Sequence, residues 1–312
     1  MEHILAFERI GKDNADWAGG KGASLGEMTK AGIPVPPGFV ILADTFREVI
    51  KDNNLAAEIS GLLKAVRVED TESIDEASKK IRELIAKAKT PENIEQEILK
   101  HFDELKAKHI AVRSSATAED STTASWAGEL ETYLNTPRDN LLETVKKCWS
   151  SLFTPRAIFY RIEKKMQDDD VAVAVVVQKM VESEISGIAF TVHPVTKDSN
   201  SMVIEAGWGL GEAIVGGQVT PDTYTIDKKN MKVADVYQSE QEMMIIRDGN
   251  ETKEAPVPSE KKSQQKLSEK QILELAEICL KIEKHYGKPQ DIEWAFEDNK
   301  FYIVQSRPIT TL

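Results

Sequence analysis

The sequence is poor in the features that mark several large classes of protein. It has only two cysteines, Cys148 and Cys279, far apart in the chain, so neither a disulfide framework nor a paired-cysteine metal site is indicated. No apolar run approaches the roughly 18 residues that a membrane-spanning helix needs. The N-terminus, Met1–Glu8, lacks the basic start and apolar core of an export signal. We therefore expect a cytoplasmic protein in a reducing compartment that does not insert into a membrane.

Positive charge and familiar catalytic arrangements are also scarce. Acidic residues outnumber basic ones by 52 to 40, a net charge of −12, which argues against a nucleic-acid partner because phosphate backbones attract clustered Lys and Arg. The spacing G-x-x-x-x-G-K-[ST] is absent, which excludes a P-loop nucleotide hydrolase as the first interpretation. The five histidines are scattered, and no Ser-His-Asp or Cys-His arrangement stands out.

Length and patterning predict a mixed α and β protein. A chain of 312 residues should divide into two or three lobes. Residues 43–108 have helical periodicity, and the spacing Ser268-x-x-Gln271 predicts the capped start of another helix. Val171–Val177 has no polar member, which predicts a central strand buried on both faces. Further strands are expected at residues 187–192, 202–205, 223–226 and 233–236, and the polar stretch 249–265 is expected to be an exposed loop or lid.

The last two predicted strands carry polar residues at alternate positions. Alternation places Asp291 and Glu293 on one face of a sheet, and Gln305 and Arg307 on one face of theirs. Carboxylate and amide oxygens suit Mg²⁺, which usually also binds substrate phosphates, and an arginine adds a positive fork for phosphate oxygens. The alternative is an edge hairpin with a solvated polar face.

A hairpin would bring the two polar faces together. If residues 298–300 form a three-residue loop, Glu297 pairs with Phe301. The register that follows is Glu293 opposite Gln305 and Asp291 opposite Arg307.

Two segments in the first half of the chain have the composition of anion sites. Gly19–Gly26 combines four glycines with Lys21 directly before an expected helix, so backbone amides and a point charge could approach a phosphate. A tight turn with an incidental lysine is the alternative. Ala111–Asp120 places Arg113 at the end of a strand, where it could clamp a phosphate. The alternative there is a loop of capping residues.

Two segments of the second half add weaker signals. Glu205–Glu212 is a second glycine-rich loop, but its G-x-G-x-G spacing differs from the dinucleotide pattern. Gln178–Val181, directly after the buried strand, could be a hinge whose backbone reads an adenine edge, or a plain strand end. Taken together, the glycine loops, cations, carboxylates and amide suit a magnesium polyphosphate.

With these residues in view, the chain resembles the nucleotide-binding domain of the phosphoenolpyruvate synthase (pyruvate, water dikinase) family, within the ATP-grasp superfamily. The resemblance covers nearly the whole chain. The matching segments are GGKGASLGEM at 19–28, IPVPPGF at 33–39, AVRSSATAED at 111–120, SWAGELETYLN at 125–135, CWSSLFTPRAIFYR at 148–161, SGIAFTVHPVT at 186–196, EAGWGLGEAIVGGQVTPD at 205–222, and DIEWAF with IVQSRPIT at the end.

The resemblance implies an α+β ATP-grasp fold of two lobes, with ATP and Mg²⁺ in the cleft between them. Residues 1–181 would form an N-terminal lobe with a helical portion, and residues 182–312 a C-terminal lobe that carries the hairpin. Lys21 and Arg113 would contact the ATP phosphates and, with Arg307, supply the catalytic positive charge. The remaining implied roles are adenine contacts for Gln178, Lys179, Met180 and Val181, Mg²⁺ ligation by Glu293 and Gln305 beside Asp291 and Arg307, and a place near the nucleotide for Thr132 and Glu184. The family often has Gln-Gln where this chain has Glu129-Leu130, which leaves the contacts of that loop open.

The resemblance also implies a partner. Full-length members of the family continue into a swivelling domain whose histidine accepts a phosphoryl group from ATP, and then into a barrel that phosphorylates pyruvate. This chain ends at Leu312 with no histidine in a threonine-rich acceptor loop. We expect it to perform only the ATP half of the reaction ATP + pyruvate + H₂O → AMP + phosphoenolpyruvate + phosphate, delivering the β-phosphoryl group to a histidine on another chain or segment.

Two alternatives stay open. Rifamycin phosphotransferases share this nucleotide domain and the same partner-histidine logic, so the final acceptor could differ. A regulatory module could instead bind ATP without turnover. The joint presence of Lys21, Arg113, Glu293, Gln305 and Arg307 argues against the regulatory interpretation, because a sensor has less need of the full charge set.

Overall fold

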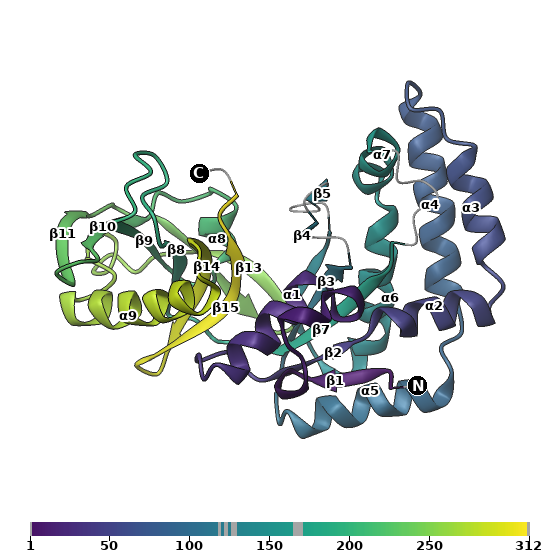
Figure 1. Ribbon diagram of the computed structural model, residues 1–312, viewed down its shortest axis with the longest axis horizontal. Helices are drawn as coiled ribbons and strands as arrows, with labels where there is room; N and C mark the ends of the chain where they lie inside the picture. Colours follow the sequence, from purple (N-terminus) through teal and green to yellow (C-terminus); the bar gives the residue numbers. More distant parts are fainter. Residues whose placement is uncertain (1, 118–119, 122–123, 126–129, 165–170, 311–312) are drawn as a thin grey trace. The chain divides into compact units, whose positions relative to one another are not determined.

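The chain forms two compact units. The computed structural model describes residues 2–117, 120–121, 124–125, 130–164 and 171–310. Unit 1 consists of Met1–Glu27 and Pro37–Met180, and unit 2 of Met28–Pro36 and Val181–Leu312. Both mix helices with antiparallel sheets, so the expected α+β class is confirmed (Figure 1). Within the described residues, no helix is both long and apolar enough to cross a membrane.

Unit 1 is built on a five-stranded antiparallel sheet with β7 at its centre. The run from Val173 to Val177 is 0% exposed at every position, so the predicted central strand, buried on both faces, is confirmed. The short apolar side chains of this run pack against layers on both sides of the sheet. The strands in sheet order are β1 (Ile4–Ala6), β2 (Gly38–Ile41), β7 (Val173–Lys179), β3 (Ile110–Ala116) and β6 (Thr132–Thr136).

Helices surround this sheet. Residues 43–108 form four helices up to the start of β3, as their periodicity predicted, and α4 packs against α6 and α7. Helix α6 also contacts β3 and β7, which places it on one face of the sheet. The helices are α1 (Ala15–Lys30), α2 (Ala43–Asp52), α3 (Ala56–Lys64), α4 (Thr71–Lys87), α5 (Glu92–Glu104), α6 (Leu141–Ser150) and α7 (Pro155–Glu163); short pieces are η1 (Phe7–Arg9), η2 (Lys12–Asn14), η3 (Arg138–Asn140), η4 (Ser151–Phe153), β4 (Asp120–Ser121) and β5 (Ala124–Ser125).

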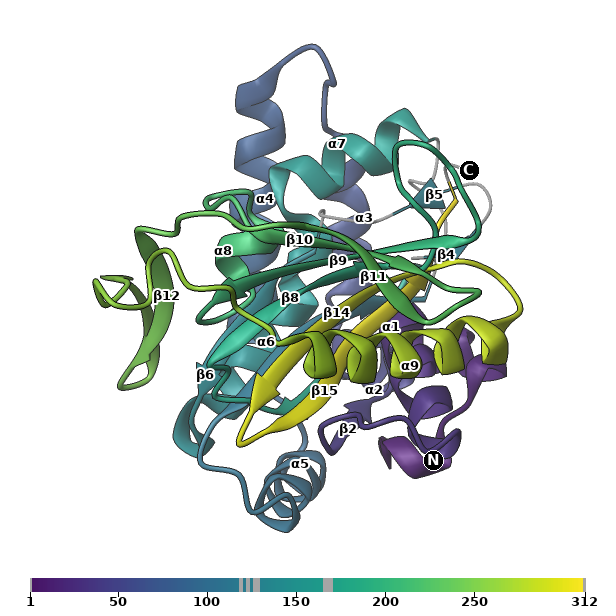
Figure 2. The same ribbon diagram turned by 90° about the vertical axis from the view of Figure 1, so that its left-hand side faces the viewer.

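Unit 2 contains a six-stranded antiparallel sheet that α9 crosses, as Figure 2 shows. Ser268 caps α9 with Gln271 in the predicted capping box, and Gly287 ends the helix at φ 67°. The strands in sheet order are β11 (Lys232–Tyr237), β10 (Asp222–Asp227), β9 (Ser201–Trp208), β8 (Ile185–Phe190), β14 (Gln290–Glu297) and β15 (Lys300–Pro308); the helices are α8 (Glu212–Val215) and α9 (Glu269–Tyr286).

A separate hairpin, β12 (Met243–Asp248) with β13 (Glu251–Pro256), projects beside the six-stranded sheet (Figure 2). The expectation of a loop or lid at residues 249–265 is wrong for its first part, which forms the hairpin turn and β13. The reason is that a two-stranded ribbon exposes most of its side chains. Few residues of its strands therefore have to be apolar, and their composition resembles that of a loop. Residues 257–266 have turns and no regular element.

A fully buried ion pair holds the segment before α9 against this sheet. Nζ of Lys266 lies 2.8 Å from Oδ1 of Asp222, and neither side chain is exposed. The Asp222 carboxylate also accepts hydrogen bonds from the Tyr224 hydroxyl at 2.8 Å and from the Ser239 amide at 2.9 Å. Burial raises the pKa of the Tyr224 phenol, so this hydroxyl keeps its proton and remains a donor. The pair is therefore surrounded by hydrogen-bond partners, as a buried charge requires.

Replacing Lys266 with methionine should destabilise the protein strongly. The Asp222 carboxylate would stay buried without its cation, a situation that typically costs about 3 kcal/mol or more in the free energy of unfolding. Urea denaturation followed by tryptophan fluorescence measures the loss. The double variant Lys266→Met with Asp222→Asn should recover part of it, because the remaining donors then face a neutral acceptor. A loss below about 1 kcal/mol in the single variant would contradict this role for the pair.

Candidate functional site

The glycine motif Gly19–Gly26 lies inside helix α1, not in a loop before it. The helix runs from Ala15 to Lys30 with one interruption, at Gly19, whose backbone has φ 69° and ψ 168°. A Cβ atom built on Gly19 would stand 2.1 Å from Oγ and 2.4 Å from the carbonyl oxygen of Ser115. Glycine is thus required at this position for two reasons, the positive φ and the close approach of β3. The break in α1 presents the segment with Lys21 to the sheet.

One row of cross-strand neighbours in unit 1 contains two of the predicted nucleotide-contact residues, Arg113 and Thr132. Val40 pairs with Val176, Val176 with Arg113, and Arg113 with Thr132. Side chains of directly paired residues share one face of a sheet. Gly22 lies over Val40 on that face, since a Cβ on Gly22 would be 3.0 Å from Cγ2 of Val40. Helix α1 therefore packs on the face that carries Arg113 and Thr132, with Val40 and Arg113 two strands, or about 10 Å, apart.

The predicted adenine segment begins on the same face. Gln178 follows Val176 by two positions on β7, so its side chain shares the face of Arg113, and it is 2% exposed. The amides of Lys179 and Met180 already donate to the carbonyl oxygens of Pro37 at 2.9 Å and His109 at 3.2 Å. These two donors are committed inside unit 1. A purine edge bound at this segment must use other groups.

The hairpin of unit 2 has the predicted polar register but not the predicted turn. Glu297 pairs with Lys300, so the loop has two residues, Asp298 and Asn299, with φ of 50° and 59°. Positive φ at both central positions is the requirement of a type I′ hairpin turn. The expected three-residue loop, with Glu297 opposite Phe301, is therefore wrong.

A β-bulge restores the register further along the hairpin. The pairing shifts by one residue between Trp294, which faces Ile303, and Glu293, which faces Gln305. Beyond the bulge, Glu293 pairs with Gln305 and Asp291 with Arg307, so both predicted cross-strand pairs are confirmed. The predicted residues lie together on one face of β14 and β15, while Ile292 and Trp294 on the other face are buried.

An ion pair fixes the arginine of this face. Nε and one terminal nitrogen of Arg307 lie 2.9 Å and 2.8 Å from Oδ2 of Asp291. The Asp291 side chain is 16% exposed and that of Arg307 is 48% exposed, so the guanidinium is held at the surface by a mostly covered carboxylate. Both donors converge on one oxygen, which sets the direction of the guanidinium, a group whose forked shape suits phosphate oxygens.

A further carboxylate shares this face, and sequence reasoning gave it no role. Glu205 on β9 pairs with Ile188 on β8, and Ile188 pairs with Glu293 on β14. Burial and the negative charge of Asp291 raise the pKa of Glu205. Its one signal in the sequence is that it opens the glycine-rich segment Glu205–Glu212. Its alignment with Glu293 depends on the pairing of β8 with β9 and β14, which no local pattern reveals.

Glu184 is engaged inside unit 2. Its amide donates to the Phe296 carbonyl at 2.9 Å, its carbonyl accepts from the Gly209 amide at 3.0 Å, and its carboxylate accepts from the Asp298 amide at 3.2 Å. It therefore joins the hairpin turn to the second glycine-rich loop. Residues 118–119 and 126–129 of the matched sequence segments, among them Glu119 and Glu129, lie outside the described residues.

Comparison with known families gives a match over residues 15–312 to the pyruvate phosphate dikinase AMP/ATP-binding domain. The chain belongs to this family. The family expected from the sequence motifs is thereby confirmed, and with it a domain whose members bind ATP or AMP.

Curated relatives of this dikinase-family chain are much longer proteins. It is 50% identical to a probable phosphoenolpyruvate synthase of Archaeoglobus fulgidus over 99% of its own length and 42% of the relative's. It is 48% identical to a probable phosphoenolpyruvate synthase of Methanocaldococcus jannaschii over 100% of its length and 27% of the relative's. It is also 40% identical to a rifampicin phosphotransferase of Bacillus cereus over 99% of its length and 36% of the relative's. The chain thus spans less than half the length of these relatives.

The donor set on the hairpin of this dikinase-family domain suits a hard divalent cation only in part. Within the described residues there is no group of three His, Cys, Asp or Glu side chains that could hold a metal ion. Glu293 and Gln305 are direct cross-strand neighbours and are both half-buried, so their side chains lie side by side on one face of the sheet. Two protein oxygens fit Mg²⁺ because this ion commonly takes its remaining ligands from water and substrate phosphates.

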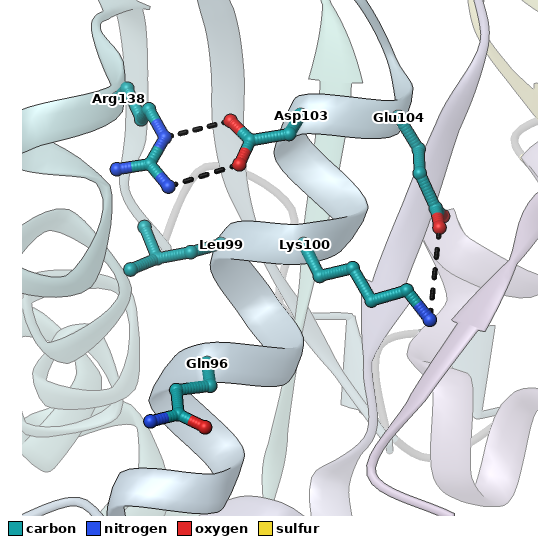
Figure 3. A pocket seen from close by; sticks show the side chains of 6 residues that line it. All are labelled: Gln96, Leu99, Lys100, Asp103, Glu104 and Arg138. Atoms are coloured by element: carbon teal, nitrogen blue, oxygen red, sulfur yellow. Dashed lines mark hydrogen bonds and ion pairs between the residues drawn. The ribbon is translucent and has the colours of Figure 1, made fainter.

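A shallow pocket elsewhere in unit 1 contains none of the predicted site residues. It lies along α5 and is lined by Gln96, Leu99, Lys100, Asp103, Glu104 and Arg138 (Figure 3). Both of its cations are paired: Arg138 donates to both Asp103 oxygens, at 2.7 Å and 3.0 Å, and Lys100 lies 3.9 Å from Glu104. The Arg138 hydrogen bond lowers the pKa of Asp103. Solvated ion pairs on a helix surface explain this pocket without a ligand.

The raised pKa of Glu205 yields a pH-dependent prediction. The folded state holds the Glu205 proton more tightly than the unfolded chain, so ionising this group destabilises the fold as the pH rises above the ordinary glutamate value of about 4.3. Glu205→Gln should therefore be more stable than the parent at pH 7, and the difference should shrink as the pH falls through the raised pKa and be absent below the ordinary glutamate value of about 4.3. Urea denaturation at several pH values, in EDTA and without nucleotide, measures this.

The matched control for this prediction is Glu242→Gln, since Glu242 is an exposed glutamate of the same unit, 67% exposed and paired with Lys262. It should show no such gain at pH 7. A Glu205→Gln protein that is no more stable than the parent at pH 7 would mean that the carboxylate is not strained by its surroundings.

Proposed function

We propose that this chain is the ATP-binding, phosphoryl-transferring domain of a phosphoenolpyruvate synthase-like dikinase. It would bind Mg-ATP and deliver a phosphoryl group to a histidine on another chain or segment. The fold would be of the ATP-grasp type, with units 1 and 2 as its two lobes. The observation that carries the proposal is the paired register of Glu293 with Gln305 and Asp291 with Arg307 on one half-exposed face, in a chain whose family binds ATP or AMP.

Unit 1 would hold the triphosphate and the base. Arg113, 8% exposed, presents a charged fork from a covered position, where electrostatic interactions are less screened than in bulk water. Lys21, in the glycine-rich part of α1, supplies a point charge to phosphate oxygens. Thr132 lies next to Arg113 across the sheet, and Gln178 lies further along the same face, beside the segment that would line the adenine pocket. These assignments follow the sequence resemblance, and the shared face of the sheet supports them.

Unit 2 would hold the metal and the remaining phosphate contacts. Glu293 and Gln305 would ligate Mg²⁺, which neutralises charge on phosphate oxygens. Arg307 would contact a phosphate from the position that Asp291 sets. Since phosphoryl transfer asks little covalent chemistry of the protein, the role of these residues is to orient the phosphates and stabilise negative charge.

The histidines of the described chain support an acceptor elsewhere. His3 lies between Glu48 and Glu97, His109 is buried, and Nδ1 of His193 accepts hydrogen bonds from the Val195 and Thr196 amides. The other two, His101 and His285, lie on helices α5 and α9, so none of the five histidines, all within the described residues, combines an exposed imidazole with a position in a loop. The proposed acceptor is therefore a histidine on a further domain, as the greater length of the relatives allows.

A second candidate function rests on the relative from Bacillus cereus. Its name, rifampicin phosphotransferase, and its 40% identity over 99% of this chain make an antibiotic a possible final acceptor. The same ATP half-reaction would serve both. Product analysis with pyruvate and with rifampicin, each added to the chain together with a histidine-bearing domain, separates the two.

Replacing Glu293 with alanine should abolish phosphoryl transfer while leaving the fold intact. The expected loss of rate is about 100-fold or more, the range found when a preorganised charge-stabilising group is removed. The measurement is AMP formation from Mg-ATP with a separately supplied histidine-bearing domain, alongside the melting temperature. Glu242→Ala is the control, because Glu242 lies outside the hairpin. A Glu293→Ala protein with unchanged transfer, or one that fails to fold, would refute the proposed role.

A further inference from the structure

A single serine hydroxyl bridges the break in helix α1. Oγ of Ser115 accepts a hydrogen bond from the Gly22 amide at 3.3 Å and donates one to the Ala18 carbonyl at 3.2 Å. Ser115 and Ala18 are both 0% exposed. Gly22 and Ala18 are four residues apart, so they are the donor and acceptor that an unbroken α-helix would pair directly. The hydroxyl of β3 thus inserts into the hydrogen-bond ladder of α1 at its break.

The two hydrogen bonds are made by residues on either side of Lys21 in the chain. Ala18 and Gly22 flank the segment Gly19–Lys21, and Gly19 at the break is in contact with Ser115 itself. Both ends of this segment are therefore hydrogen-bonded to β3, which fixes its position. A side chain at Gly19 would clash with the Ser115 backbone as well as its hydroxyl, so the close approach does not depend on the hydroxyl alone.

Strand alternation connects the same serine to Arg113. Arg113 and Ser115 are two residues apart on β3 and share one face of the sheet, the face on which α1 packs. Ser114 lies on the opposite face, where it donates to the Cys148 carbonyl at 3.2 Å and accepts from the Ser151 hydroxyl at 2.9 Å. Two adjacent buried serines therefore do different things. Of these two serines, it is Ser115 that joins β3 to the lysine-bearing segment.

We propose that Ser115 is a positioning residue that couples Lys21 to Arg113, so that both cations stand in place before a polyphosphate binds. This inference rests on the proposed function, in which the two cations contact the ATP phosphates. Without the hydroxyl, the Gly22 amide and the Ala18 carbonyl lose a buried partner and the break in α1 can relax. Binding must then also order the Lys21 segment, which weakens affinity.

The test compares Ser115→Ala with Ser114→Ala. Each removes one buried hydroxyl from β3, so both should lose some thermal stability, but only Ser115→Ala should weaken Mg-ATP binding. The expected loss in affinity is between about threefold and tenfold, as for one hydrogen bond. Isothermal titration of the full chain with Mg-ATP measures it. Equal affinities of the two variants would overturn the coupling.

A double variant shows whether Ser115 acts through Lys21. If it does, Lys21→Ala with Ser115→Ala should bind Mg-ATP no more weakly than Lys21→Ala alone, because the group that Ser115 positions is already gone. Fully additive losses would mean that Ser115 affects binding by another route, and would refute the proposal.

Amide hydrogen exchange separates failure of this inference from failure of the proposed function. In the chain without nucleotide, Ser115→Ala should speed exchange of the Gly22 amide, whereas Ser114→Ala should not. Unchanged Gly22 exchange overturns the bridging role whatever the protein binds. If Ser115→Ala speeds Gly22 exchange but the parent chain binds no Mg-ATP, the proposed function is overturned, and with it the role of Ser115 in binding.

Discussion

The two-residue period of a β-strand is the constraint on which both units depend. In unit 1 it places Val176, Arg113 and Thr132 in one row, with α1 packed on their face and α6 on the other. In unit 2 it places Glu293 and Gln305 on a half-exposed face while Ile292 and Trp294 fill the core. A slip of one residue would exchange the two faces of a strand. Burial of the apolar face therefore fixes the register, and the register fixes which charged groups meet.

Partners within the protein then hold the charged groups where the strands place them. Asp291 orients Arg307, Glu184 joins the hairpin turn to the second glycine-rich loop, and Ser115 bridges the break in α1 next to Lys21. Long cationic side chains lose much rotamer freedom when they bind a ligand. A group that is already oriented loses less, so these contacts are expected to favour binding even where each adds little to the stability of the fold.

The hairpin shows how far local sequence patterns reach. Alternation was enough to predict which residues of β14 and β15 share a face, and both polar pairs are as expected. The turn was not, because Asp298 and Asn299 accept positive φ and allow a two-residue loop as readily as a longer one. The bulge beside Trp294 then offsets this error by one residue. Bulges depend on how a strand fits its neighbours, so the correct pairing was reached through a wrong turn. The all-apolar strand β7 was easier, since its composition alone requires burial on both faces.

Interactions between distant segments set the limit of such predictions. The glycines around Lys21 were recognised as a motif, but a loop before a helix and a break within one have the same composition. What distinguishes them is Ser115, whose hydroxyl completes the helix from a strand far along the chain. Glu205 was missed for the same reason, because its alignment with Glu293 passes through β8. In both cases the residue types are visible in the sequence, and their chemistry follows only from the strand or helix that packs beside them. The buried serine is the stronger example, since nothing about an isolated serine predicts that its hydroxyl bridges a broken hydrogen bond in the backbone of another element.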